Sequence, residues 1–191
     1  CLMPVKVLNK NGSGTYSNIA KGIRFAADNG AQIINLSLGG PSSSTTLEDA
    51  LAYAYNKGVT IVAAAGNSGS STLGYPAAYN AYVIAVGATR YDEALSYYSN
   101  FGSSLDLVAP GGDLNVDQNG DGYGDGVLQN TFNPFSKNTK DFGYWFFQGT
   151  SMAAPHVTGT AALVLTVPAK CDSDADGKCS PAEVKTRLET T

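Results

Sequence analysis

The segment Gly149–His156 reads Gly-Thr-Ser-Met-Ala-Ala-Pro-His and contains a candidate nucleophile. Ser151 lies between an aromatic run, Tyr144–Phe147, and a stretch of small apolar residues typical of a buried helix. Free N–H groups and the positive end of the dipole at a helix start favour negative charge on an attached oxygen. We therefore predict that Ser151 is a nucleophile, although a lone Gly-x-Ser is more often a helix cap.

A serine needs a base to accept its proton, and the sequence contains a single histidine, His156. His156 follows Ser151 by five positions, which on a helix turns its side chain about 140° away. We expect it to satisfy a buried polar contact instead.

Asn67 is a candidate hydrogen-bond donor that would act together with Ser151. It follows the apolar run Val59–Ala65, so it is expected at the carboxyl end of a strand, where open α/β proteins place their sites. Its side-chain amide and the N–H of Ser151 are suited to stabilising an oxyanion. The alternative is that Gly66–Gly69 forms only a polar turn.

The run Ile33–Leu38 ends in two glycines, and its last residues are candidate substrate-binding positions. An extended peptide pairs with an open strand end through main-chain hydrogen bonds, which demand no particular sequence. The candidates are Ser37, Leu38, Gly39 and Gly40. A Gly-Gly-Pro turn that merely leaves the strand explains the same residues.

Three strings in this order resemble the subtilisin-like serine proteases (subtilases): Asn35-Leu-Ser-Leu-Gly-Gly40, Ala63-Ala-Ala-Gly-Asn-Ser-Gly69 and Gly149-Thr-Ser-Met-Ala-Ala-Pro-His-Val157. The resemblance implies a three-layer α/β fold, Ser151 as nucleophile and Asn67 in the oxyanion hole. It adds Ala64 and Gly66 to the substrate cleft. It also places Tyr75-Pro76 where many subtilases have a cis peptide, although most X–Pro bonds are trans.

The resemblance further implies that the aspartate and histidine of the triad precede the stretch corresponding to Met3–Leu8. We therefore expect a partial peptidase domain spanning residues 1–191, incomplete at both ends, with acidic loop insertions at 111–141 and 171–183. The isolated chain is expected to lack a complete triad, and the missing part of the same domain is its expected partner.

Residues 172–183 fit the twelve-residue pattern of an EF-hand calcium loop. The expected oxygen ligands come from Asp172, Asp174, Asp176, the Lys178 carbonyl, Ser180 and Glu183. Pro168–Cys171 stands where an entering helix would be, which suggests a single grafted loop that a Cys171–Cys179 bridge would pin. The alternative is a solvated acidic turn.

A second acidic loop repeats this alternation of oxygen-bearing and small residues, with a structural Ca²⁺ as its expected ligand. The candidates are Asp113, Asn115, Asp117, Asn119, Asp121 and Asp125. Leu128 occupies the place of the bidentate glutamate if Asp117 is position 1, so we expect weaker or differently built binding. A polar loop is the alternative.

The remaining pattern predicts an α/β protein with a mainly parallel sheet. Apolar runs at Met3–Leu8, Ile33–Leu38, Val59–Ala65 and Val83–Val86 predict strands, and the helical spacing of Ile19–Ala27, Leu47–Tyr55, Met152–Val167 and Pro181–Thr190 predicts helices. Residues 111–141 show no periodicity, which predicts a long surface excursion.

Composition excludes several classes of protein. Hydrophobic residues make up 43% of the 191, charged residues only 15%, and no apolar run reaches the roughly 18–20 residues of a membrane span. A net charge of −4 without a basic stripe disfavours nucleic acid as a partner.

These features favour a secreted serine endopeptidase that cleaves proteins or peptides. The cysteine pair and calcium loops fit an oxidising, calcium-rich exterior. One alternative is a calcium-stabilised binding or remnant domain without catalysis. Another is an α/β-hydrolase esterase, but Ala153 stands where its Gly-x-Ser-x-Gly elbow requires glycine.

Overall fold

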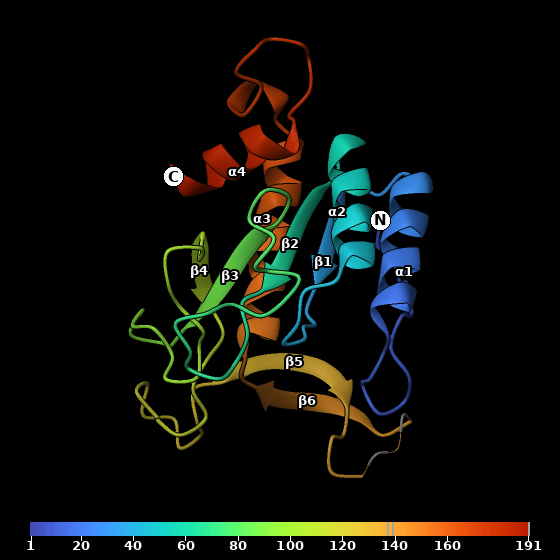
Figure 1. Ribbon diagram of the computed structural model, residues 1–191. Helices are drawn as coiled ribbons and strands as arrows, with labels where there is room; N and C mark the ends of the chain where they lie inside the picture. The colour runs from blue at the N-terminus through green and yellow to red at the C-terminus, as the bar shows by residue number, and fades with distance from the viewer. Residues whose placement is uncertain (137, 139, 191) are drawn as a thin grey trace.

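The computed structural model of the protein describes residues 1–136, 138 and 140–190 (Figure 1). The elements in chain order are α1 (Tyr16–Asp28), β1 (Ile33–Leu36), α2 (Thr45–Asn56), β2 (Thr60–Ala64), β3 (Ile84–Thr89), β4 (Leu107–Pro110), β5 (Val127–Phe132), β6 (Phe142–Phe147), α3 (Thr150–Leu165), the 3₁₀ helix η1 (Pro168–Lys170) and α4 (Pro181–Glu189).

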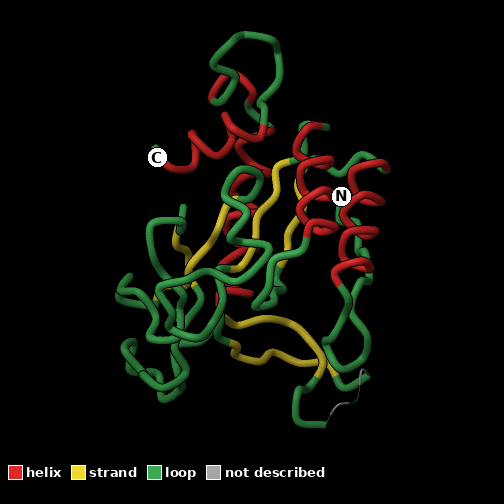
Figure 2. Tube along the Cα trace, in the orientation of Figure 1, coloured by secondary structure: helices red, strands yellow, loops and turns green. Residues whose placement is uncertain are grey.

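Strands β1 to β4 form one parallel sheet in chain order. Helices α1 and α2 pack together and cover one face, while α3 crosses the other face in contact with all four strands (Figure 2). The fold is therefore α/β with three layers, as the sequence predicted.

The nearly continuous apolar sequence of β2 reflects this covering by helices on both faces. Ile61 and Ala63 point into the core beneath α1 and α2, whereas Val62 and Ala64 point into the core beneath α3. Side chains alternate between the faces of a strand, so a strand buried on both faces is mostly apolar, and Thr60 is the one polar residue of β2. All five residues of β2 are buried.

The prediction of a strand at Met3–Leu8 is wrong. This segment pairs with no described strand, and the ladder hydrogen bonds that define a strand need a neighbour. Val5 and Val7 nevertheless pack against the α1–α2 core, and Gly22 of α1 gives Val7 room because a Cβ there would collide with it. Strand β4 was not predicted from the sequence.

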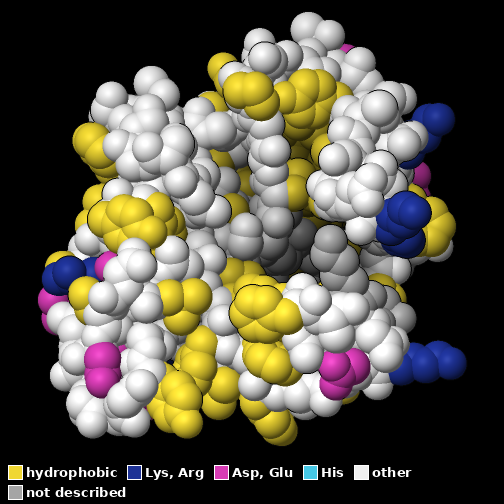
Figure 3. All heavy atoms as spheres, turned by 90° about the horizontal axis from the view of Figure 1, so that it is seen from below, with side chains coloured by type: hydrophobic (Ala, Val, Ile, Leu, Met, Phe, Trp, Pro, Cys, Tyr) yellow, Lys and Arg dark blue, Asp and Glu magenta, His cyan; other side chains and the backbone are white. Residues whose placement is uncertain are grey.

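The region 111–141 is not wholly irregular, because β5 lies within it and pairs antiparallel with β6 from Val127↔Phe147 to Phe132↔Phe142. This hairpin lies across the end of the molecule where the parallel strands finish (Figure 1). Its exposed hydrophobic side chains include Leu128, Phe132, Phe142, Tyr144 and Phe146. Seen from this side, hydrophobic groups are spread over a face with few charges (Figure 3).

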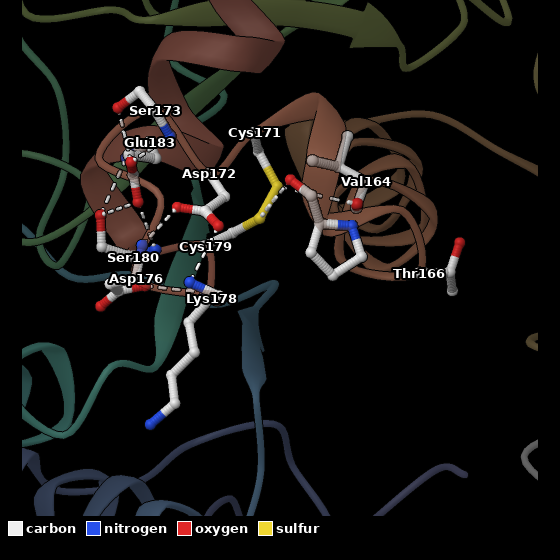
Figure 4. Close-up of a disulfide and its surroundings, with 12 residues drawn as sticks. Val164, Thr166, Cys171, Asp172, Ser173, Asp176, Lys178, Cys179, Ser180 and Glu183 are labelled. Atoms are coloured by element: carbon white, nitrogen blue, oxygen red, sulfur yellow. Dashed lines mark hydrogen bonds between the residues drawn. A yellow bond between two sulfur atoms is a disulfide. The ribbon is translucent and has the colours of Figure 1, made fainter.

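Cys171 and Cys179 form a disulfide with Cα atoms 5.6 Å apart, and Cys1 is free and exposed. The bridge joins the two ends of the loop between η1 and α4 (Figure 4). Among the residues described, no helix has the length and apolarity needed to cross a membrane.

Candidate active site

Ser151 is the second residue of α3, next to the carboxyl ends of β1 and β2. The helix is preceded by Gly149, whose φ of 146° lies in a region that only glycine adopts freely, and this N-cap residue has no side chain to accept a helix N–H. The Met152 N–H is taken by the Gly149 carbonyl at 2.9 Å. The Ser151 N–H finds no acceptor within the described chain, so a free donor and the positive helix end lie beside the hydroxyl.

Asn67 is held in one orientation by Thr150. The Asn67 Oδ1 accepts the Thr150 N–H at 2.9 Å and the Thr150 hydroxyl at 2.8 Å. Because both bonds engage the oxygen, the Nδ2 donors are directed away from Thr150, and they bond no other described residue. Asn67 is exposed, so this donor is available to a ligand.

The loop that carries Asn67 is built around the buried side chain of Asn100. The Asn100 Oδ1 accepts hydrogen bonds from the N–H groups of Ser68 and Ser70 and from the Ser68 hydroxyl. Its Nδ2 donates to the Ala65 and Thr72 carbonyls at 3.2 and 3.0 Å. One amide therefore satisfies backbone groups across the whole loop.

Gly66 has to be glycine for two reasons. Its φ of 113° is strained for any other residue, and a Cβ would collide with the Asn100 Nδ2. Its N–H donates to the Thr150 hydroxyl at 3.2 Å. Thr150 therefore ties the backbone before Asn67, and Asn67 itself, to the first turn of α3.

A second polar network ties the end of β1 to α3. The Ser37 hydroxyl donates to the Ser151 carbonyl at 2.8 Å and accepts from the Asn35 Nδ2 at 2.9 Å. The Asn35 Oδ1 in turn accepts from the Thr158 hydroxyl at 3.0 Å. Ser37 thus ties the end of β1 to the start of α3, and its place near a substrate stays a prediction.

A cleft of about 450 Å³ brings most of the predicted residues together. Its lining comprises Leu38, Gly39, Gly40, Pro41, Ala64, Gly66, Asn67, Ser68, Thr72, Leu73, Gly74, Asn100, Thr150 and Ser151. Every predicted catalytic and substrate-binding residue lines it except Ser37, which contacts Ser151 from outside.

The expectation that both glycines offer open backbone is wrong for Gly40. Its N–H donates to the Tyr75 carbonyl at 2.8 Å, and its carbonyl accepts the Tyr75 N–H at 2.9 Å. The backbone of Gly40 is therefore already paired with a loop that is distant in sequence. Leu38 and Gly39 pair with no other described backbone, so they keep the groups that an extended peptide needs. The Tyr75–Pro76 bond is cis.

His156 does not act on Ser151. It lies on the outward face of α3, where its Nδ1 is 2.8 Å from the Met152 carbonyl of its own helix. The prediction that it satisfies a buried contact is wrong, because the residue is exposed. The helical periodicity that turns it away from Ser151 also turns it away from the sheet.

Sequence reasoning missed Thr150 and Asn100 as organisers of the site. Thr150 is fully buried, and the sequence motif indicates its neighbour Ser151 as the candidate nucleophile. Asn100 is 33 positions from Asn67 in a segment without a recognised motif. Only the tertiary fold brings it under the loop.

The arrangement of a serine at a helix start, an oriented amide and a strand end in one cleft agrees with the comparisons with known proteins. The model of the subtilase family matches residues 1–191. The chain belongs to the subtilase family. It is 45% identical to Subtilisin DY of Bacillus licheniformis over 169 residues, covering 86% of this chain and 54% of that protein. It is 46% identical to Subtilisin Savinase of Lederbergia lenta, covering 85% and 52%.

Solved structures agree with this assignment. A cold adapted subtilisin-like serine proteinase matches with a TM-score of 0.72 and 31% identity, covering 97% of this chain and 57% of that one. Proteases from Pseudoalteromonas arctica match with a TM-score of 0.77 and 35% identity, covering 94% and 52%. The chain spans about half the length of these relatives.

In this subtilase, the loop 172–183 gathers three carboxylates. Oxygen atoms of Asp172, Asp174 and Asp176 all lie within 4.8 Å of one another. The Glu183 carboxylate turns toward two serines instead, accepting the N–H and hydroxyl of Ser173 and of Ser180 (Figure 4). The Ser173 and Ser180 donors lower the pKa of Glu183 to about 2. The full six-ligand set stays a prediction.

The loop 113–125 is folded on its own backbone. The Asp117 carboxylate accepts the N–H groups of Gly120, Asp121 and Gly122. Asn119 donates to the Asp121 carboxylate at 3.1 Å. These exposed side chains close a turn, whereas Asp113 and Asp125 at its base are buried. The EF-hand-like register of this loop also stays a prediction.

Proposed function

We propose that this chain carries the nucleophile and the oxyanion hole of a serine endopeptidase. The Ser151 hydroxyl attacks the carbonyl carbon of a peptide bond and loses its proton to a base. The negative charge that develops on the carbonyl oxygen is met by two donors, the Ser151 N–H and the Asn67 Nδ2. Collapse of the tetrahedral intermediate expels the amine, which takes up the proton, and leaves an acyl-enzyme that water hydrolyses.

The base and the carboxylate that orients it come from outside these 191 residues. The sequence has one histidine, and that residue lies away from Ser151. The relatives that the chain resembles are about twice as long as the matched part. We infer that the remaining portion of the same domain supplies both groups, and that the chain alone hydrolyses peptides poorly.

The substrate is an extended protein or peptide segment. The backbone groups of Leu38 and Gly39 are available for strand-like pairing, and the cleft continues from them to Ser151. Main-chain pairing supports an endopeptidase, because it requires no free peptide end.

The observation that carries this proposal is the locked Asn67 amide beside the free Ser151 N–H. The test is to treat the whole protein with a fluorophosphonate, which phosphonylates an activated serine, and to map the adduct by mass spectrometry. We expect modification at Ser151 with loss of peptide hydrolysis, and neither reaction in Ser151→Ala. Hydrolysis that survives in Ser151→Ala would refute the assignment.

The alternative is a calcium-stabilised domain that never had a triad. It predicts no fluorophosphonate adduct in the whole protein under conditions in which the domain is folded. The same experiment therefore separates the two functions.

We also propose that the loop 172–183 binds a structural Ca²⁺ in a secreted protein. The three gathered aspartates supply oxygen ligands of the kind that Ca²⁺ prefers, and the Cys171–Cys179 bridge holds the two sides of the loop together. The disulfide supports an oxidising compartment outside the cytoplasm.

A further inference from the structure

Asp113 and Asp125 are buried opposite each other at the base of the second acidic loop. They form an antiparallel bridge in which the Asp113 N–H donates to the Asp125 carbonyl at 2.8 Å. Residues directly opposite in such a pair project to the same side, with Cβ atoms about 4.5–5.5 Å apart. The two residues are only 3% and 8% exposed, so both carboxyl groups are withdrawn from solvent on the same side of this pair.

The hydrogen bonds of this pair leave an oxygen without a donor. The Asp113 Oδ1 accepts the Asn115 N–H at 3.0 Å, and the Asp125 Oδ2 accepts the Gln118 N–H at 2.6 Å. The Asp125 Oδ1 is buried and accepts nothing. Within the described residues, no lysine or arginine pairs with either aspartate. A buried, unpaired carboxylate beside a like charge is costly unless a cation offsets it.

We propose that Asp113 and Asp125 hold a Ca²⁺ ion that positions the nucleophile. Two carboxylates, completed by carbonyl or water oxygens, suit Ca²⁺ because it accepts flexible sets of oxygen ligands. This ligand pair differs from the EF-hand-like register, whose central residues Asp117 and Asp121 are exposed and bonded within their own turn.

Short contacts connect this pair to Ser151. Gly111, two residues before Asp113, accepts the Gly149 N–H at 2.9 Å, and the Leu114 N–H donates to the Gln148 Oε1 at 2.6 Å. The segment clasped by these bonds leads directly into Thr150 and Ser151.

Tyr98 holds the backbone just before Asp113 in place. Its hydroxyl donates toward the carbonyls of Gly111 and Gly112 at 2.9 and 2.7 Å. Burial raises the pKa of this phenol, which keeps it a donor. A cation at Asp113 and Asp125 therefore holds residues 111–114 in place, and these residues in turn hold Gln148 and Gly149, just before the start of α3. This part of the proposal rests on the proposed function, whereas the cation binding does not.

The binding test starts from a protein in which the other loop is disabled by Asp172→Asn, Asp174→Asn and Asp176→Asn. Titration of the metal-stripped protein with Ca²⁺ alone is followed by isothermal calorimetry. Adding Asp125→Asn should remove one Ca²⁺ per molecule, whereas adding Asp121→Asn, in the same loop, should leave the number unchanged. Equal stoichiometry with and without Asp125→Asn overturns the site, and a loss with Asp121→Asn overturns the ligand pair.

In thermal unfolding, the proposal predicts that Asp125→Asn shifts the midpoint in opposite directions with and without Ca²⁺. With excess Ca²⁺, Asp125→Asn should lower the midpoint, because a ligand is lost. With a chelator it should raise the midpoint, because an unpaired buried charge is removed. A higher midpoint in both buffers overturns the proposal. If Asp125→Asn does not fold, Asp113→Asn is expected to show the same reversal and the same loss of one Ca²⁺.

The positioning effect is measured as a split between kcat and KM in the whole protein with the other loop disabled. Chelation should lower kcat and leave KM nearly unchanged, since Leu38 and Gly39 lie on a different segment of the cleft. In Asp125→Asn, kcat should be low and insensitive to Ca²⁺. A change in KM alone overturns the positioning role, while calorimetry decides the site even if the protein proves inactive.

Discussion

The Asn67 side-chain oxygen accepts both the backbone N–H and the hydroxyl of Thr150, at 2.9 and 2.8 Å. This pair of bonds decides which end of the amide faces the cleft, since an amide flipped by 180° would place its NH₂ group against the Thr150 N–H. The orientation of the amide that we propose as the oxyanion donor is therefore fixed before any substrate binds. Such preorganisation is what makes a donor effective in the transition state.

Thr150→Val keeps the shape of the buried side chain but removes the hydroxyl that orients Asn67. If the whole protein has the proposed activity, we expect its kcat to fall roughly five- to tenfold, because one hydrogen bond of about 1 kcal/mol that orients the Asn67 amide is lost. KM should change little. Steady-state kinetics on a peptide substrate measures both.

The matched control is Thr160→Val on the exposed side of α3, where the hydroxyl bonds the His156 carbonyl of the same helix. It should leave both constants nearly unchanged. If Thr150→Val also leaves kcat unchanged, the hydroxyl does not position Asn67.

Asn67→Ala removes the proposed oxyanion donor itself. We expect kcat to fall by about 10²–10³, the range established on a subtilisin for an oxyanion-hole amide, with KM nearly constant because the bond forms mainly in the transition state. The same kinetic assay measures the loss. A rise in KM with an unaltered kcat contradicts the assignment and would make Asn67 a ground-state binding residue.

Asn100→Asp tests the amide that organises the loop around Asn67. The replacement keeps one acceptor oxygen but turns a second oxygen toward the carbonyls of Ala65 and Thr72. We expect a loss of about 3 kcal/mol or more in the free energy of unfolding, because two buried acceptors lose their donor and face a charge. Urea denaturation at neutral pH measures the change.

Asn130→Asp provides the comparison, since Asn130 is exposed on β5. It should cost less than about 0.5 kcal/mol, as is usual for surface substitutions. Similar losses for the two variants would show that the Asn100 network contributes nothing special.

The elements that the sequence predicted well are those with local signals. Strand β2 is buried on both faces, and the nearly continuous apolar run Val59–Ala65, with Thr60 as its one polar residue, predicts it. Helix α2 begins at a serine cap, Ser44, whose hydroxyl accepts the Leu47 N–H, and Gly58 follows its end. The position of Ser151 at a helix start was predictable for the same reason.

Features that depend on distant partners could not be predicted. The sequence around Gly40 fits either an open strand end or a turn. Only the pairing of Gly40 with Tyr75 excludes the open strand end. Met3–Leu8 has strand composition but no neighbouring strand among the described residues. Strand β5 carries three consecutive polar residues, Gln129–Thr131, which break the apolar alternation typical of a half-buried strand and hide its pairing with β6. Pairing partners, not propensity, decided each case.

Removal of calcium should destabilise the protein through the loop 172–183. A ligand present at 100 times its Kd adds about 2.7 kcal/mol, so a chelator should lower Tm by about 5–10 °C in a chain of this size. Asp174→Asn should reduce that difference, whereas the exposed helical Asp49→Asn should not. Differential scanning calorimetry with and without a chelator measures it. A Tm that a chelator leaves unchanged contradicts a structural role for calcium.

Glu183 predicts a pH dependence of stability in calcium-free buffer. Hydrogen bonds from Ser173 and Ser180 lower its pKa from 4.5 to about 2 in the folded protein. A depressed pKa means that the unfolded chain takes up the proton first, so the contribution is fully present above about pH 4.5 and is lost as the pH falls toward 2. This contribution to stability is lost when the Glu183 carboxylate, which caps α4, becomes protonated.

The prediction is measured as the difference in Tm between wild type and Glu183→Gln across this range. The difference should be constant above pH 4.5 and shrink steadily below it, because the capping box formed by Ser180 and Glu183 loses its charge in the wild type alone. Glu189→Gln, at the other end of α4, serves as the control and should give a difference that does not follow this window. A Glu183→Gln difference that stays constant down to pH 2 would mean that the serine donors do not stabilise the carboxylate selectively.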